Sequence, residues 1–190
     1  MSIRIGNRIS YCGSGGTGKS TSAKFLAQEL RLPLIKSAAR SVYEERNLSE
    51  ESVQAISKEG KLELQKEIFD KKIELDKQYE YVADRTILDH YCYALAYCSS
   101  FMDNSYFLEM EEKVRQLMLS TYSYIFYFPF GYWFPKSDNV RQDHLSWQSM
   151  IDALLVGYII RWGLSVTTVP QMYEEDYRNE FILKTIKGEK

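Results

Sequence analysis

Hydrophobic and polar positions follow two rhythms along the chain, and the change between them predicts alternating strands and helices. Short apolar runs at 8–12, 32–35, 79–83, 122–128 and 165–169 have the length and composition of β-strands. Between these runs, apolar residues recur at intervals of three and four, which is typical of helices with one buried face. Strands that alternate with helices predict an α/β fold, with a parallel sheet, right-handed crossovers and helices on both faces.

The helices that this pattern predicts fill the spaces between the strands. We expect them over 19–30, 37–45, 58–78, 87–99, 106–120, 147–159 and 176–186. The polar segment 47–52 is interpreted as a break, and 131–145 as a loop or small lid. The run 122–128 is continuous and aromatic, as expected for a strand that is buried on both faces, with Phe126 and Phe128 on one face and Tyr127 on the other. Without repeats or linkers, residues 1–190 are expected to form a single domain.

Composition places the chain among ordinary globular proteins. Of its 190 residues, 45% are hydrophobic and 26% are charged, which excludes a disordered chain, a collagen-like fibre and a disulfide scaffold. The net charge of −2 supplies no general basic field to attract nucleic acid or an anionic membrane. Aromatic content is high at 14%, with 15 tyrosines. These tyrosines fit either a tyrosine-rich core or a surface that stacks on flat ligands, and composition does not choose between the two.

Cysteine usage and the absence of targeting patterns suggest a reducing compartment. Cys12, Cys92 and Cys98 form no CxxC pair, so we expect buried free thiols. The two histidines lack the spacing of metal ligands, which argues against zinc. The first eight residues contain no signal-peptide core, and no apolar run reaches the ~18 residues of a membrane span. We therefore expect a cytoplasmic protein, in the host cytoplasm if it is viral, with no membrane partner.

A complete phosphate-binding motif follows the first predicted strand. The pattern GxxxxGK[ST] is satisfied at every fixed position, and the candidate nucleotide-binding residues are Gly13, Ser14, Gly15, Gly16, Thr17, Gly18, Lys19, Ser20 and Thr21. Glycines allow successive backbone N–H groups to point at a phosphate, and the helix that begins near Lys19 adds a positive dipole. Lys19 would lie between the β- and γ-phosphates, and the Ser20 hydroxyl would bind Mg²⁺. The motif predicts ATP and Mg²⁺ as cofactors.

An acidic residue at the end of the third predicted strand belongs to the same edge of the sheet. Ligands of open parallel sheets collect beyond the carboxyl ends of the strands, so Asp84 is expected beside the phosphate motif. Its carboxylate can hold Mg²⁺, accept a proton from the acceptor hydroxyl, or cap the following helix. Arg85 is a candidate catalytic and substrate-binding residue, with a structural salt bridge as the alternative. Asp89, one turn further on, is interpreted as a solvated or capping carboxylate.

Candidate acceptor-binding residues lie further from the motif. Arg40 follows the second predicted strand, where a guanidinium suits a phosphate or a base carbonyl. Gln65 occupies the inward face of a long helix, where its amide can read a base edge or bond to the backbone. Arg141, favoured over Lys136, is the lid cation expected to neutralise charge during transfer. Trp133 belongs to an aromatic group that fits base stacking, a plug under the lid or a homodimer contact equally well.

Several of these segments together resemble a known kinase group. The segments are the phosphate motif, Ser37-Ala38-Ala39-Arg40, Leu62-Glu63-Leu64-Gln65, Asp84-Arg85-Thr86-Ile87-Leu88-Asp89 and Asp138-Asn139-Val140-Arg141. In this order they resemble small AAA-type P-loop kinases, which are related to the ribosylnicotinamide kinase module and include phage-encoded nucleoside and nucleotide kinases. The Asp-Arg pair is also similar to that of thymidylate kinases. The resemblance implies a three-layer P-loop kinase fold with five parallel strands, and it implies that Arg178 lies near the nucleotide base.

The sequence therefore favours an ATP- and Mg²⁺-dependent phosphotransferase. The expected acceptor is a nucleoside or (deoxy)nucleoside monophosphate, in nucleotide metabolism of the phage type that the resemblance implies. The tyrosine- and tryptophan-rich approach to the lid and its single arginine depart from the usual pattern, so the acceptor's identity stays open. Two alternatives remain. One is a kinase that acts on a hydroxyl of a modified base or sugar within DNA, and the other is a nucleotide-binding ATPase or switch without transfer.

Overall fold

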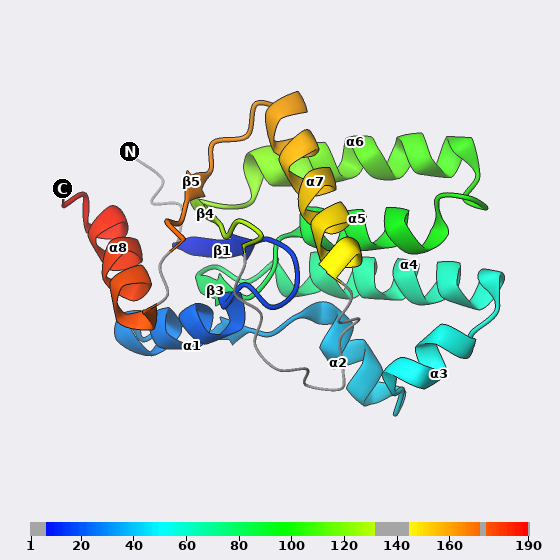
Figure 1. Ribbon diagram of the computed structural model, residues 1–190, viewed down its shortest axis with the longest axis horizontal. Helices are drawn as coiled ribbons and strands as arrows, with labels where there is room; N and C mark the ends of the chain where they lie inside the picture. Colours follow the sequence, from blue (N-terminus) through cyan, green and yellow to red (C-terminus); the bar gives the residue numbers. More distant parts are fainter. Residues whose placement is uncertain (1–6, 132–144, 172–173, 190) are drawn as a thin grey trace.

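The sheet at the centre of the protein is entirely parallel. The computed structural model describes residues 7–131, 145–171 and 174–189. The strands of the sheet are β1 (Arg8–Cys12), β2 (Leu34–Ile35), β3 (Tyr81–Ala83), β4 (Tyr124–Tyr127) and β5 (Thr167–Thr168). They pair in the order β2-β3-β1-β4-β5, so the strand that precedes the phosphate motif lies in the middle (Figure 1). This architecture confirms the predicted five-stranded parallel sheet.

Helices cover both faces of this sheet, which makes three layers (Figure 1). They are α1 (Lys19–Leu30), α2 (Ala38–Glu45), α3 (Glu50–Ala55), α4 (Lys58–Leu75), α5 (Ile87–Cys98), α6 (Asn104–Ser120), α7 (Leu145–Arg161) and α8 (Glu175–Lys187). Helices α1 and α8 pack on one face, and α5, α6 and α7 contribute to the hydrophobic core on the other. The predicted α/β fold, with helices on both faces of a parallel sheet, is therefore the fold observed.

Alternation along the strands divides the core between these two faces. Phe126 and Phe128 pack in the cluster with α1 and α8, whereas Ile125 and Tyr127 belong to the cluster with α5 and α7. The predicted split of these side chains is confirmed, and it follows from the two-residue period of a strand. Each such side chain, when fully buried, contributes about 1.5–3 kcal/mol to folding. This packing fixes the strand ends at which the polar loops begin.

The polar segment interpreted as a break contains the start of a short helix instead. Helix α3 begins at Glu50, and the Ser49 hydroxyl caps it by accepting a hydrogen bond from the Ser52 backbone N–H at 3.2 Å. The prediction was wrong here because serines supply a local cap that hydrophobic periodicity does not report. A second difference is that α4 ends at Leu75, three residues before the predicted end.

The state of the cysteines agrees with the expectation from the sequence. Cys12, Cys92 and Cys98 are all buried and free, as predicted. None of the helices in the described ranges is long and apolar enough to cross a membrane. Tyr11, Tyr81 and Tyr91 are fully buried, so part of the aromatic excess belongs to the core.

Candidate active site

The phosphate motif forms a tight loop between β1 and α1, and several of its glycines, including Gly13 and Gly18, cannot be replaced without strain. Gly13 has φ 148°, and a Cβ there would lie 2.4 Å from the carbonyl oxygen of Phe128. Gly18, at the start of α1, has φ 90°, a value that other residues rarely adopt. The loop therefore has the glycine-dependent backbone that the sequence predicts for a phosphate cradle.

Lys19 lies inside this loop. Its side chain is only 4% exposed, and its Nζ donates hydrogen bonds to the Ser14 carbonyl oxygen and, at 2.8 Å, to Thr17 Oγ1. Burial, and secondarily the neighbouring Arg85 charge, lower the pKa of Lys19 to about 7. An ammonium that is held by the loop's own oxygens is ready to exchange them for those of a phosphate, which would restore its preference for the charged form.

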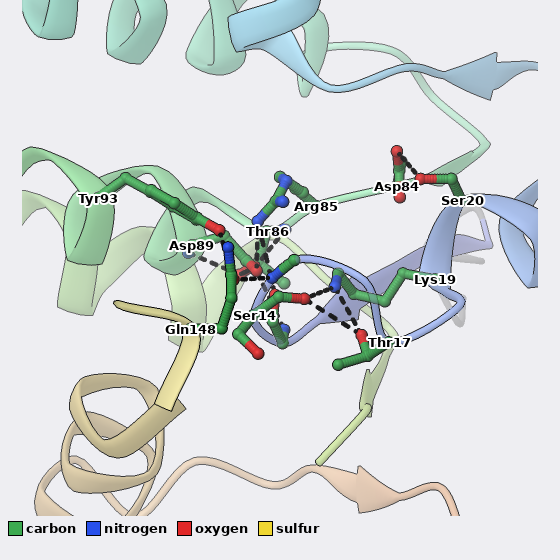
Figure 2. Close-up of polar contacts among 12 residues, drawn as sticks. Ser14, Thr17, Lys19, Ser20, Asp84, Arg85, Thr86, Asp89, Tyr93 and Gln148 are labelled. Atoms are coloured by element: carbon green, nitrogen blue, oxygen red, sulfur yellow. Dashed lines mark hydrogen bonds and ion pairs between the residues drawn. The ribbon is translucent and has the colours of Figure 1, made fainter. Parts of the chain in front are cut away.

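Ser20 and Asp84 meet where α1 begins and β3 ends. The Ser20 hydroxyl donates a hydrogen bond of 2.8 Å to Asp84 Oδ2 (Figure 2). Asp84 is 7% exposed, and its Oδ1 is buried without a hydrogen-bond partner among the described residues. A hydroxyl beside a carboxylate with one unused oxygen suits a hard divalent cation such as Mg²⁺. These two residues thus fit the metal that the motif implies.

Asp89 connects the loop to the start of α5. It is fully buried, and its Oδ1 accepts a hydrogen bond of 3.0 Å from the Gly13 backbone N–H. Its Oδ2 accepts hydrogen bonds from the Thr86 backbone N–H at 3.0 Å and from the Thr86 hydroxyl at 2.6 Å, which completes a capping box. The capping role is therefore confirmed, but the solvated one is wrong, because the loop from β1 covers the carboxylate.

Arg85 is anchored to the cradle through Gly13 and Asp89. Its Nη1 lies 3.4 Å from Asp89 Oδ1 and donates a 3.5 Å hydrogen bond to the Gly13 carbonyl oxygen. Its guanidinium lies over the Tyr93 ring, 4.9 Å from the ring centre. Arg85 therefore has the ion pair of the structural alternative and, at the same time, lines the pocket described next.

A pocket opens beside the cradle, between α2, α4, α5 and α7. It brings together the sequence-predicted residues Ser20, Arg40, Gln65, Asp84 and Arg85. Four aromatic side chains also line it, namely Tyr43, Tyr93, Tyr97 and Trp147. Of the remaining predicted residues, Trp133 and Arg141, like Lys136, lie outside the described residues. Part of the aromatic excess therefore lines a pocket that Ser20 of the phosphate motif also lines.

Two further polar side chains at this pocket were missed by sequence reasoning. His90 is 3% exposed, and burial, followed by the Arg85 charge, lowers its pKa well below the usual value, so its imidazole is neutral. Gln148, from α7, accepts a hydrogen bond from the Gly15 backbone N–H at 2.5 Å. The spacing of Asp89, Tyr93 and Tyr97 places them on one face of α5, which could have indicated that this face lines the site. No signal in the sequence indicates that α7 contacts the phosphate loop.

The last two predicted nucleotide-binding residues differ in their contact with the loop. Arg178, from α8, is buried against it, since a Cβ at Gly18 would lie 2.8 Å from its Nη1. Its Nε has no partner among the described residues. Thr21 is exposed on the first turn of α1. The position of Arg178 is thus compatible with the expected contact to the nucleotide, whereas Thr21 stays a prediction from its neighbours alone.

Solved structures of kinases share this fold at low sequence identity. Deoxyadenosine kinase from M. mycoides with bound dATP matches with a TM-score of 0.66 and 12% identity over 94% of this chain and 98% of that one. The NadR protein in complex with NAD and AMP-PNP matches with a TM-score of 0.68 and 15% identity over 97% of this chain, which spans 49% of NadR. Shikimate kinase from Aquifex aeolicus matches with a TM-score of 0.62 and 16% identity over 95% of this chain and 96% of that one.

The sequence itself identifies the family. No curated protein matches the chain significantly. Residues 8–176, which run from β1 into α8, match an AAA domain family, and this range includes the phosphate motif, Asp84 and Gln148. The chain therefore belongs to this AAA domain family and has the fold of the P-loop kinases.

Proposed function

We propose that the protein is a phosphotransferase that moves the γ-phosphate of ATP to a hydroxyl of a nucleoside or nucleoside monophosphate. The observation that carries this proposal is the Ser20–Asp84 hydrogen bond of 2.8 Å, which lies between the phosphate cradle and the aromatic pocket. Phosphoryl transfer needs a donor site, a cation and an acceptor site in contact with one another. An ATPase or a switch would need the donor site and the cation, but it would not need the pocket.

The donor side of the reaction rests on the loop and α1. Backbone N–H groups of the loop and the positive end of α1 would bind the phosphates, and Lys19 would neutralise part of their charge. Ser20 and Asp84 would hold Mg²⁺, which supplies Lewis-acid stabilisation of phosphate charge when bound. Support for ATP as the donor comes from NadR, whose structure contains AMP-PNP, and from deoxyadenosine kinase, whose structure contains dATP.

The acceptor side rests on the pocket. Its aromatic side chains offer flat surfaces on which a base can stack, at about 1–3 kcal/mol per base. The Gln65 amide, 6% exposed, can form hydrogen bonds with a base edge, and Arg40 can bind a carbonyl or a phosphate oxygen. Arg85 lies between pocket and loop, where its charge would orient the acceptor, and Asp84 can accept the hydroxyl proton if the metal leaves it an oxygen.

The direct test is transfer of label from [γ-³²P]ATP to a panel of nucleosides, nucleoside monophosphates and modified-base DNA. We expect label on one or more of the small acceptors, and no label on any acceptor with the Lys19→Ala variant. Lys24→Ala is the matched control, since this lysine lies on the exposed face of α1. Release of inorganic phosphate without a labelled acceptor would favour the ATPase alternative, and full activity of Lys19→Ala would exclude the donor site.

A further inference from the structure

Gln148, a side chain of α7, contacts the phosphate loop. Its Oε1 accepts the Gly15 backbone N–H at 2.5 Å and the Tyr93 hydroxyl at 3.5 Å. The side chain is 3% exposed and covers Gly15 so closely that a Cβ there would lie 2.8 Å from Oε1 and 2.9 Å from Nε2. Figure 2 shows Gln148 reaching from α7 to the loop, with Tyr93 beside it.

This contact lies at the boundary between two sites. Gly15 belongs to the loop whose N–H groups bind phosphate, and Gln148 lines the pocket assigned to the acceptor. A phosphoryl group that is transferred from one site to the other must pass this boundary. In a loaded enzyme we therefore expect the terminal phosphate of the donor to be the group nearest to Gln148, with the inner phosphates further along the loop toward α1.

We propose that Gln148 is a binding residue for the terminal phosphate and that it takes the place of a phosphate oxygen when the loop is empty. The inference rests on the proposed function, because it requires a nucleoside triphosphate in the loop. In the empty protein Oε1 satisfies the Gly15 N–H, a donor that would otherwise be buried without a partner. In the loaded protein a phosphate oxygen accepts this N–H instead.

The amide group is suited to this exchange because it has both an acceptor and a donor. An oxygen of Gln148 that stayed in place would repel the phosphate oxygens. Rotation of the terminal amide presents Nε2, whose two N–H groups can donate to the phosphate. No covalent N–H bond breaks in this step, because Gly15 and Gln148 exchange hydrogen-bond partners without any proton transfer. A carboxylate at this position satisfies Gly15 equally well but cannot donate, and it adds a negative charge.

The test compares Gln148→Glu with Gln148→Met, using Mg²⁺ with ADP and with the non-hydrolysable analogue AMP-PNP as probes in calorimetry. We expect Gln148→Glu to weaken AMP-PNP binding at least tenfold and ADP binding less than threefold, because only AMP-PNP carries the terminal phosphoryl group. Gln148→Met keeps the length of the side chain but has neither the amide group nor a charge, so we expect it to reduce the preference for AMP-PNP over ADP about three- to tenfold. Ser149→Glu, exposed on the same helix, controls for added charge.

Each outcome of this test either supports or overturns the proposed role of Gln148. If Gln148→Glu does not fold by circular dichroism, the ratio of ADP to AMP-PNP dissociation constants in Gln148→Met decides. A ratio equal to that of the wild type, or equal losses for both nucleotides in Gln148→Glu, would overturn the role of Gln148 and leave the kinase proposal intact. Failure of the wild-type protein to bind either nucleotide would instead overturn the proposed function on which the inference rests.

Discussion

At the scale of single residues, the buried lysine of the phosphate loop makes nucleotide binding depend on pH. In the empty protein the pKa of Lys19 is about 7, because of burial and then of the Arg85 charge. A bound phosphate favours the charged form and raises this pKa, so binding above pH 7 takes up a proton. By linkage, affinity then falls as the pH rises above 7, by up to about tenfold per pH unit.

Calorimetry of Mg·ADP between pH 7.5 and 9 measures this effect directly. Titrations in buffers of different ionisation enthalpy should show uptake of a fraction of a proton that increases with pH. Lys19→Arg is the control, because a guanidinium stays charged throughout this range. A wild-type affinity that does not change between pH 7.5 and 9 would show that Lys19 is charged in the empty loop.

Asp84 is the residue for which the sequence leaves three roles open, and its environment argues against one of them, the helix cap. Its Oδ2 accepts from Ser20 and its Oδ1 has no partner among the described residues, so capping does not occupy the carboxylate. The N-terminus of α5 is capped by Thr86 and Asp89 instead. We therefore expect Asp84→Asn to reduce kcat at least 100-fold, within the range for a group that manages a metal or a proton.

The same variant should bind ATP within about threefold of the wild type, because the loop holds most of the phosphate contacts. Single-turnover kinetics and calorimetry measure the two quantities separately. Asp70→Asn, an exposed residue of α4, controls for the loss of one charge. An unchanged kcat would leave Asp84 without a part in the reaction.

At the scale of elements, a buried chain of hydrogen bonds connects the end of α4 to the start of α5. Lys72, 1% exposed, forms an ion pair of 2.6 Å with Asp76, whose Oδ2 accepts from the Tyr122 hydroxyl at 2.7 Å. The Tyr122 hydroxyl in turn accepts the Ile87 backbone N–H at 2.9 Å. Because α5 also carries Asp89, which holds the loop through Gly13, this chain supports the phosphate cradle from a distance.

Removing the Lys72 ammonium from this series of hydrogen bonds should lower the free energy of unfolding. Lys72→Met leaves the Asp76 carboxylate without its cation, and we expect a loss of about 3 kcal/mol of unfolding free energy. The estimate is at the low end for a buried pair because Tyr122 keeps its hydrogen bond to Asp76. Urea denaturation measures it. Lys71→Met is the matched control, since Lys71 pairs with Glu45 at the surface and should contribute less than about 1 kcal/mol. Equal losses in the two variants would contradict the assigned importance of burial.

Strands and helices could be predicted from the sequence where the pattern that indicates them lies within the element itself. Hydrophobic periodicity is local, so the strands and most helices lie within a few residues of the predicted ranges. The cap of α3 depends on two serine hydroxyls, and hydrophobic periodicity is blind to it. Tyr122 was assigned to a strand, and nothing near it in the sequence indicates that its hydroxyl meets Asp76, which lies 46 residues earlier.

At the scale of the whole molecule, the topology of the sheet explains which site residues could be predicted. The rule that ligands collect at the carboxyl edge of a parallel sheet places Asp84 beside the phosphate loop, because β3 and β1 are neighbours in the strand order. No such rule applies to α7, so the meeting of Gln148 with Gly15, 133 residues apart, depends on how that helix packs. Sequence reasoning therefore placed Asp84 beside the phosphate loop, but it did not foresee that Tyr93, Trp147 and Gln148 line the pocket.

The charge of the whole molecule gives a last prediction, which concerns the class of acceptor. With a net charge of −2, the protein has no general attraction for polyanions. Within the described residues, the charged side chains that line the pocket are Arg40, Arg85 and Asp84, which suit a small acceptor better than a polymer with many phosphates. We therefore expect kcat/KM for a nucleoside acceptor, at saturating ATP, to change less than threefold between 50 and 200 mM salt.

A single-stranded DNA acceptor would behave differently in the same assay. Each phosphate contact contributes about 0.7 to the logarithmic dependence on salt, so three contacts would reduce kcat/KM about 20-fold over this fourfold change in concentration. A nucleoside and a short oligonucleotide that carries the same acceptor group, compared side by side, separate the two cases. A steep decline for the oligonucleotide, combined with a higher kcat/KM than for the nucleoside at low salt, would assign the aromatic pocket to a base presented by DNA. A weakly salt-dependent reaction with the free nucleoside would assign it to a small acceptor.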